Sequence, residues 1–259
     1  MAAPVLQVPV LEVKALQKRF AGIVATNDLS LDVMPGETHA LIGPNGAGKT
    51  TLIAQLQGEL SPDGGQIFFN GKDITREPAH KRAHLGIARS FQITSIFPQF
   101  TVLANVAMAV QARAGHSFQF FRCAWDDPAL KNPALEAIDS IGLTHRAGIY
   151  AEDLSHGERR QLELAMALAM KPALLLLDEP MAGMGRQDGQ RMTKILEGLK
   201  RQYAILLVEH DMDAVFALAD RISVLVAGRA IATGSPEAIR NDPAVKAAYL
   251  GHGSQDMGS

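Results

Sequence analysis

The sequence predicts an α/β fold, in which a mostly parallel sheet carries an antiparallel β subdomain and an inserted helical subdomain. Short apolar runs have the character of strands that are buried on both faces; they are residues 40–42, 173–177 and 204–208. From residue 101 to about residue 154 the apolar residues change to helical spacing, which indicates the helical insertion. A chain of 259 residues can bury a sizeable core, so one large domain is expected.

Composition and charge weigh against nucleic-acid binding and against a membrane-spanning chain. With 25 basic and 27 acidic residues, the chain lacks the positive excess that duplex binding usually demands, so we expect no nucleic-acid partner. The N-terminal residues do not have the pattern of a signal peptide, and no apolar run has the length of a membrane span. The single cysteine, Cys123, rules out an internal disulfide and fits a reducing compartment. The protein is expected to be soluble or peripheral to a membrane.

The antiparallel subdomain is predicted from the first third of the chain. Residues 11–16 and 29–33 alternate well enough for strands. Residues 64–74 indicate a hairpin that turns at the Asn70-Gly71 dipeptide, which tolerates the positive φ angles of a tight turn. These strands are expected to form scaffold rather than site.

A phosphate loop is predicted at residues 43–50, which fit the pattern G-x-x-x-x-G-K-[ST] without a mismatch between a strand and a helix. The glycines let backbone N–H groups approach phosphate oxygens, at the positive end of the helix that opens at Lys49. Lys49 supplies charge for the β- and γ-phosphates, and Thr50 an oxygen for magnesium. A glycine-rich turn without a ligand is the weaker alternative. The predicted nucleotide-binding residues of this loop are Gly43, Pro44, Asn45, Gly46, Ala47, Gly48, Lys49, Thr50 and Thr51.

Three further candidates follow in the second half of the chain. Ser155 with Glu158 can form a capping box, a structural interpretation, although a helix start also binds anions well. Asp178 and Glu179 end an apolar strand, at the edge where ligands bind in open α/β sheets; their alternative role is to cap the next helix. His210 follows the next apolar strand, where it is commonly a hydrogen-bonded loop residue.

Taken together, the motifs and their order resemble the ATP-binding subunit of an ABC transporter, a P-loop NTPase with a RecA-like core. The match covers nearly the whole chain. Residues 43–50 match the Walker A loop, and Gln92 matches the glutamine of the Q-loop. Residues 154–158 match the signature. Residues 174–178 match the Walker B strand, Glu179 matches the catalytic glutamate that follows it, and His210 matches the switch histidine. Phe20 falls where the family stacks adenine, whereas by position alone a single Phe is more often a core residue.

The resemblance implies ATP and Mg²⁺ as cofactors and a role for each motif. Glu179 would polarise the attacking water, His210 would hydrogen-bond the γ-phosphate, and Lys49 would neutralise charge. The implied magnesium ligands are Thr50, Gln92 and Asp178. The signature residues Ser155, Gly157 and Glu158 would complete the site of a second ATPase subunit, the same or homologous, packed head to tail.

Two departures from the family pattern concern the contacts between subunits. The signature reads Ser155-His156-Gly157-Glu158 instead of Ser-Gly-Gly-Gln, but it keeps the serine and the glycine that would touch phosphate. The loop after Glu179 usually ends in aspartate and here reaches Gly185, which puts the cross-subunit aspartate contact in doubt.

The resemblance implies the energy-coupling subunit of a membrane importer, peripheral on the cytoplasmic face of the plasma (inner) membrane. Its implied partners are transmembrane permease subunits and, indirectly, a periplasmic or extracellular solute-binding protein. Residues 97–102, 179–184 and 243–251 look like the branched-chain or hydrophobic amino-acid uptake branch. The alternatives are a soluble ABC-type ATPase acting on nucleic acid or ribosomes and, ranked last, a P-loop kinase.

The expected organisation is one ABC ATPase domain over residues 9–251, followed by a disordered tail at 252–259. Its parts are a nucleotide-binding core with the β subdomain (10–92 and 160–235), a helical signature subdomain (93–159) and C-terminal helices (236–251). The surface that meets the permease is expected at residues 92–102, where apolar side chains follow Gln92.

Overall fold

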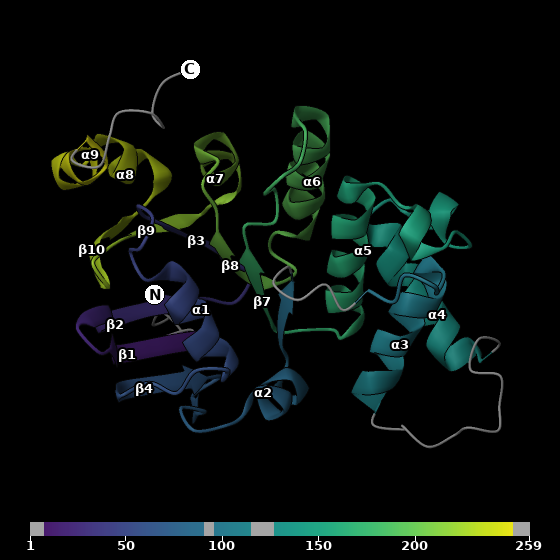
Figure 1. Ribbon diagram of the computed structural model, residues 1–259, viewed down its shortest axis with the longest axis horizontal. Coiled ribbons are helices and arrows are strands. Elements are labelled where there is room, and N and C mark those ends of the chain that lie inside the picture. Colours follow the sequence, from purple (N-terminus) through teal and green to yellow (C-terminus); the bar gives the residue numbers. More distant parts are fainter. Residues whose placement is uncertain (1–7, 91–95, 115–126, 251–259) are drawn as a thin grey trace, which may run out of the picture.

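The computed structural model describes residues 8–90, 96–114 and 127–250, which form two sheets and the helices around them (Figure 1). Gln92, Cys123 and the predicted disordered tail at 252–259 lie outside the described residues.

The central layer is a six-stranded sheet in the order β10-β9-β3-β8-β7-β6. All its neighbouring strands run parallel except β10, which pairs with β9 in the antiparallel sense. Its strands are β3 (Thr38–Ile42), β6 (Ile87–Ser90), β7 (Leu174–Asp178), β8 (Ala204–Val208), β9 (Arg221–Val226) and β10 (Arg229–Gly234). The predicted mostly parallel sheet is confirmed.

The second sheet is antiparallel, in the order β2-β1-β4-β5. Its strands are β1 (Leu11–Phe20), β2 (Ile23–Val33), β4 (Gly64–Phe69) and β5 (Lys72–Asp73). The hairpin turns at Asn70 and Gly71, with φ of +49° and +77°, as predicted. β1 continues past the predicted end at residue 16 because bulges after Val13 shift its register, so the apolar alternation stops before the strand does.

The helices α3, α4 and α5 pack on one another at one side of the molecule, the right-hand side of Figure 1. The expected boundary at 159/160 falls within α5, which also contacts β6, so we propose that this helix joins the helical subdomain to the core. The helices are α1 (Lys49–Gln57), α2 (Ala79–Leu85), α3 (Val102–Ala114), α4 (Pro128–Ser140), α5 (His156–Ala169), α6 (Arg186–Leu199), α7 (Met212–Leu218), α8 (Pro236–Asn241) and α9 (Pro243–Leu250), with 3₁₀ turns at Thr144–Arg146 and Ala151–Asp153.

Strand β7 shows why the central sheet is apolar throughout. Leu174 and Leu176 belong to the cluster formed with α1 and the antiparallel sheet, whereas Leu175 and Leu177 belong to the cluster formed with α5 and α6. Both faces are therefore covered, and each fully buried leucine contributes about 1.5–3 kcal/mol. Helix α1 packs in the first cluster through Leu52, so the loop before it is held by two sheets.

Within the described ranges, none of the helices combines the length and the apolar character that crossing a membrane would require.

Candidate functional site

The phosphate loop joins β3 to α1, and two of its glycines are required by the packing of the chain against itself. A Cβ at Gly43 would lie 2.1 Å from the carbonyl oxygen of Leu225, and a Cβ at Gly48 would lie 2.1 Å from that of Ala25. Gly46, with φ of +78°, has no atom within 4 Å of such a Cβ. The sequence argument explained the glycines by phosphate approach alone, whereas the loop is also held tightly between β2 and β9.

Lys49 is the first residue of α1, and its ammonium group lies inside the loop. Lys49 Nζ donates to the carbonyl oxygens of Gly43 at 2.5 Å and Pro44 at 3.1 Å. Burial lowers the pKa of Lys49, and the nearby carboxylates of Glu179 and Asp178 oppose this shift. No side chain caps the helix N-terminus, so the first turn of α1 presents its N–H groups to the loop.

Glu179 and His210 meet at the carboxyl ends of the adjacent strands β7 and β8. His210 Nε2 lies 2.6 Å from Glu179 Oε1, and both side chains remain about half exposed. Glu179 has φ of +52°, a left-handed conformation that costs energy for a residue with a Cβ. The alternative that Asp178 and Glu179 cap the next helix is wrong, because α6 begins at Arg186 with Gly185 as its N-cap.

Asp178 is buried and forms an ion pair that the sequence analysis did not foresee. Arg89 Nη2, from β6, donates to Asp178 Oδ2 at 2.9 Å, and the same guanidinium contacts the side-chain oxygen of Gln57. The arginine stands three residues before Gln92, and no local pattern indicates its partner because β6 pairs with β7, which is distant in the sequence.

The donor set of the candidate magnesium site is suited to a hard cation. Thr50 supplies a hydroxyl at the first turn of α1, and Asp178 supplies a carboxylate at the end of β7. The described residues contain no group of three or more His, Cys, Asp or Glu side chains that could hold a metal ion. Magnesium commonly takes one or two carboxylates and completes its shell with water and substrate phosphates, so these residues fit a metal that arrives with a nucleotide.

Glu209 is a second buried carboxylate that sequence reasoning missed. Its oxygens accept the backbone N–H groups of Met181 at 2.9 Å and His210 at 2.8 Å. Burial raises the pKa of Glu209, and these hydrogen bonds oppose the shift. Its place directly after an apolar strand does not reveal the burial, because Glu179 follows β7 in the same way and is about half exposed.

The signature forms the capped N-terminus of α5. Ser155 Oγ accepts the N–H of Glu158 at 3.2 Å, and a Glu158 oxygen accepts the N–H of Ser155 at 2.9 Å, so the predicted capping box is present. Arg146 donates to the same carboxylate at 2.7 Å and holds the pKa of Glu158 at about 2.

The signature also lies beside the loop that follows Glu179. A Cβ at Gly157 would lie 2.8 Å from the carboxyl carbon of Asp188, and a Cβ at Gly183 would lie 3.4 Å from His156 Nε2. A residue with a Cβ at position 157 would therefore require the Asp188 side chain on α6 to move.

Phe20 ends β1 with an exposed ring. The residue is 46% exposed, and Lys18 Nζ lies 5.7 Å from the ring centroid. A flat aromatic surface that is open to solvent is available for stacking.

The structure thus gathers some predicted site residues and separates others. The phosphate loop, Asp178, Glu179 and His210 lie at the carboxyl ends of the neighbouring strands β3, β7 and β8. Among the described residues, no hydrogen bond or ion pair joins Ser155, Gly157 or Glu158 to that loop. The loop and the Glu179–His210 pair therefore lie at one edge of the central sheet, whereas the capped start of α5 shares no described hydrogen bond or ion pair with that loop.

Two protein-family models match the chain. One, described as "ABC transporter", matches residues 26–182. The other, described as "Branched-chain amino acid ATP-binding cassette transporter", matches residues 231–254.

Similar proteins cover almost the full length of the chain. The high-affinity branched-chain amino acid transport ATP-binding protein LivG of Escherichia coli K12 is 37% identical over 254 residues, which cover 94% of this chain and 98% of LivG. The corresponding protein BraF of Pseudomonas aeruginosa is 35% identical over 252 residues, with 94% and 98% covered. The crystal structure of an ATP-binding cassette of an ABC transporter in its ADP conformation superposes with a TM-score of 0.82 at 27% identity, covering 95% of this chain and 100% of that one.

Proposed function

The chain belongs to the ABC transporter family, and from this premise we propose that it is the ATP-hydrolysing subunit of a membrane importer for branched-chain or other hydrophobic amino acids. The pairing of Glu179 with His210 beside the phosphate loop carries the proposal. The relatives, which are named as branched-chain amino acid transport ATP-binding proteins, support this function over a soluble ATPase acting on nucleic acid or ribosomes.

The proposed chemistry is in-line displacement at the γ-phosphate. The loop and the first turn of α1 bind the phosphates through N–H groups, and Lys49 turns from its carbonyl partners to the β- and γ-phosphates. Glu179 accepts the proton of the attacking water while the bond from the γ-phosphorus to the bridging oxygen breaks. His210 orients that carboxylate and donates to the γ-phosphate.

Magnesium, when bound with the nucleotide, would neutralise phosphate charge, and we assign Thr50, Gln92 and Asp178 to hold it. Phe20 is assigned to stack on adenine because its ring is exposed at the end of β1. The other loop residues, from Gly43 to Thr51, are assigned to the phosphate site, where all except Pro44 offer a backbone N–H.

A second ATPase subunit, packed head to tail, is proposed to receive the signature. Ser155, Gly157 and Glu158 stand at the start of α5, beside Gly183 in the loop that follows Glu179, so two segments proposed to face the partner are neighbours. A helix start is a good binding site for the γ-phosphate of the other subunit. ATP would then hold the two subunits together, and its hydrolysis would release them.

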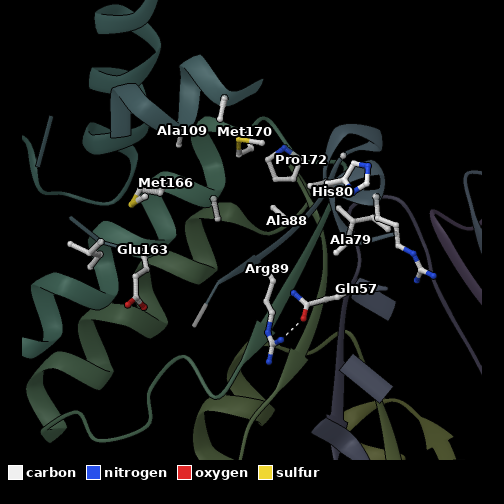
Figure 2. Close-up of a pocket in the computed structure, with 17 residues that line it drawn as sticks. Gln57, Ala79, His80, Ala88, Arg89, Ala109, Glu163, Met166, Met170 and Pro172 are labelled. Carbon is white, nitrogen blue, oxygen red and sulfur yellow. Dashed lines mark hydrogen bonds between the residues drawn. The ribbon is translucent and has the colours of Figure 1, made fainter. Parts of the chain in front are cut away.

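The proposed docking site for the permease is a groove of about 520 Å³ between α2 and β6 on one side and α3 and α5 on the other (Figure 2). Its apolar lining includes Ala79, Ala88, Ile96, Ala109, Met166 and Met170. Methionines adapt their shape to a partner, so the groove suits a short amphipathic helix from a membrane-spanning subunit. Phe97 and Phe100, which follow Ile96 in the chain, are 46% and 37% exposed, and we propose that they also meet the permease.

We propose that the chain is a peripheral subunit at the cytoplasmic face of the plasma membrane and meets a solute-binding protein only through the permease. The proposal needs no nucleic acid, in keeping with a net charge of −2.

The decisive experiment compares ATP binding with turnover in three forms of the chain. Glu179→Gln should bind ATP as the wild type does while turnover falls by at least about 100-fold, because an amide cannot accept the proton. Glu237→Gln, on the exposed first turn of α8, is the control and should match the wild type. Near wild-type hydrolysis by Glu179→Gln would refute the role of that residue.

Transport is tested separately, by copurifying the chain with its permease and measuring the uptake of labelled leucine into vesicles. Uptake that depends on ATP and disappears with Glu179→Gln supports the importer. A chain that hydrolyses ATP but copurifies with no membrane protein would contradict it.

A further inference from the structure

Glu209 is a buried carboxylate that the proposed chemistry leaves without a role. The residue is 4% exposed and directly follows β8. Its Oε1 accepts the N–H of Met181 at 2.9 Å, and its Oε2 accepts the N–H groups of His210 at 2.8 Å and Asp211 at 3.3 Å. Burying a carboxylate is costly unless hydrogen bonds satisfy it, and these three bonds explain why the group is tolerated there.

The same bonds tie together the two loops that carry the acid–histidine pair. The N–H of Glu179 donates to the carbonyl oxygen of Val208 at 2.8 Å, and Met181, two residues later, donates to Glu209. The end of β8 therefore holds the chain on both sides of Glu179. This clamp explains how Glu179 keeps a left-handed backbone with φ of +52°, since such strain persists only where the surroundings fix it.

The other member of the pair is fixed by the same carboxylate. Glu209 accepts the N–H of His210, whose ring lies 2.6 Å from the Glu179 oxygen. One buried side chain thus sets the backbone beneath both members of the pair.

We propose that Glu209 is a positioning residue for ATP hydrolysis, which aligns Glu179 and His210 through their backbones without touching the nucleotide. The inference rests on the proposed function, because it concerns the same hydrolysis. The competing explanation is that Glu209 only stabilises the edge of the sheet. If Glu209 positions the pair, substituting it lowers the rate of the chemical step. If Glu209 only stabilises the edge of the sheet, substituting it lowers the thermal stability alone.

The experiment measures kcat, the KM for ATP, ATP affinity and the thermal midpoint for Glu209→Gln and Glu209→Ala. Glutamine keeps one acceptor oxygen and turns an amide donor toward N–H groups, whereas alanine removes every acceptor. Glu37→Gln is the control for kcat, because Glu37 also accepts a backbone N–H, that of Met34 at 2.7 Å, at the opposite end of the same sheet; since Glu37 pairs with Arg221 as well, its thermal midpoint should fall while its kcat stays.

We expect kcat to fall by about 10- to 100-fold in Glu209→Gln, since a displacement of about 1 Å near the reacting atoms has effects of this order. The kcat of Glu209→Ala should fall at least as far. If that variant does not fold, the kcat of Glu209→Gln decides the test. KM and ATP affinity should stay within about twofold of wild type, and Glu37→Gln should keep its kcat.

A lowered thermal midpoint with kcat within about twofold of wild type would overturn the inference, and so would a parallel loss of ATP affinity, which would mean that the whole site has collapsed. Failure of the proposed function looks different, because the wild-type chain itself would then not hydrolyse ATP.

Discussion

Replacing Glu158 by glutamine should destabilise the chain at neutral pH, and this loss should shrink as the pH falls toward 2. The carboxylate is bound by Arg146 through two hydrogen bonds, at 2.7 and 3.2 Å, and accepts the N–H of Ser155. These contacts hold the pKa of Glu158 at about 2, below its usual 4.5. Glutamine keeps the shape of the capping box but removes the charge, and it restores the residue usual in the family.

The magnitude follows from the two pKa values. A pKa difference of this size corresponds to about 3 kcal/mol, at about 1.36 kcal/mol for each pH unit. The Arg146 side chain is 34% exposed, so water screens the pair, and we expect a loss of about 1–2 kcal/mol. Because the folded pKa lies below the unfolded one, this stabilisation is fully present above pH 4.5 and is lost as the pH falls toward 2.

Urea unfolding followed by circular dichroism, at several pH values between 7 and 3.5, measures the difference between wild type and Glu158→Gln. The difference should be largest at pH 7 and should shrink at the acid end of this range. Glu136→Gln, an exposed residue of α4, is the control and should show no such trend. A difference that stays constant across the range, or that is below about 0.3 kcal/mol at pH 7, would refute the reasoning.

Three further outcomes are expected. Gly48→Ala should lose at least about 3 kcal/mol of stability, because its Cβ would lie 2.1 Å from the Ala25 oxygen. Gly46→Ala should lose only about 1 kcal/mol, which comes from its positive φ angle. Thermal unfolding compares the two variants, and equal losses would contradict the packing argument. Phe20→Ser should weaken ATP binding by about 10-fold while Phe20→Trp preserves it, as measured by calorimetry, and unchanged binding in the serine variant would remove the stacking role. The double variant Phe97→Ser with Phe100→Ser should keep basal hydrolysis and its thermal midpoint but lose permease assembly and uptake; normal assembly and uptake would show that the permease does not bind these rings.

Sequence patterns were enough to predict the structure of those segments whose conformation depends only on residues close in the chain. The buried leucines of β7 have no polar face, and the Asn70-Gly71 turn needs positive φ, so each pattern permits one structure. The Ser155 capping box is equally local. The same holds for the start of α1 at Lys49, which the loop pattern predicts.

The contacts that sequence patterns did not predict join residues far apart in the chain. Arg89 on β6 pairs with Asp178 at the end of the neighbouring strand β7, and Glu209 after β8 accepts the N–H of Met181 in the loop after β7. Neither the charge nor the neighbours of an isolated arginine or glutamate indicate its partner, because strand order decides which side chains meet. The bulges of β1 were missed for a related reason, since its pairing with β2 and β4 overrides its weak alternation.

The order of the central strands has a consequence for folding. The candidate nucleotide site uses the ends of β3, β7 and β8, in which Thr38 pairs with Ile205 and Leu174 with Ala204. Such distant pairings require closure of a long loop, so we expect them to form late and the site to exist only in the finished sheet. A nucleotide that binds only the folded chain raises its free energy of unfolding by about 2.7 kcal/mol when the free nucleotide concentration is about a hundred times the Kd. In a growing or partly unfolded chain, nucleotide binding would therefore report that the two halves of the sequence have met.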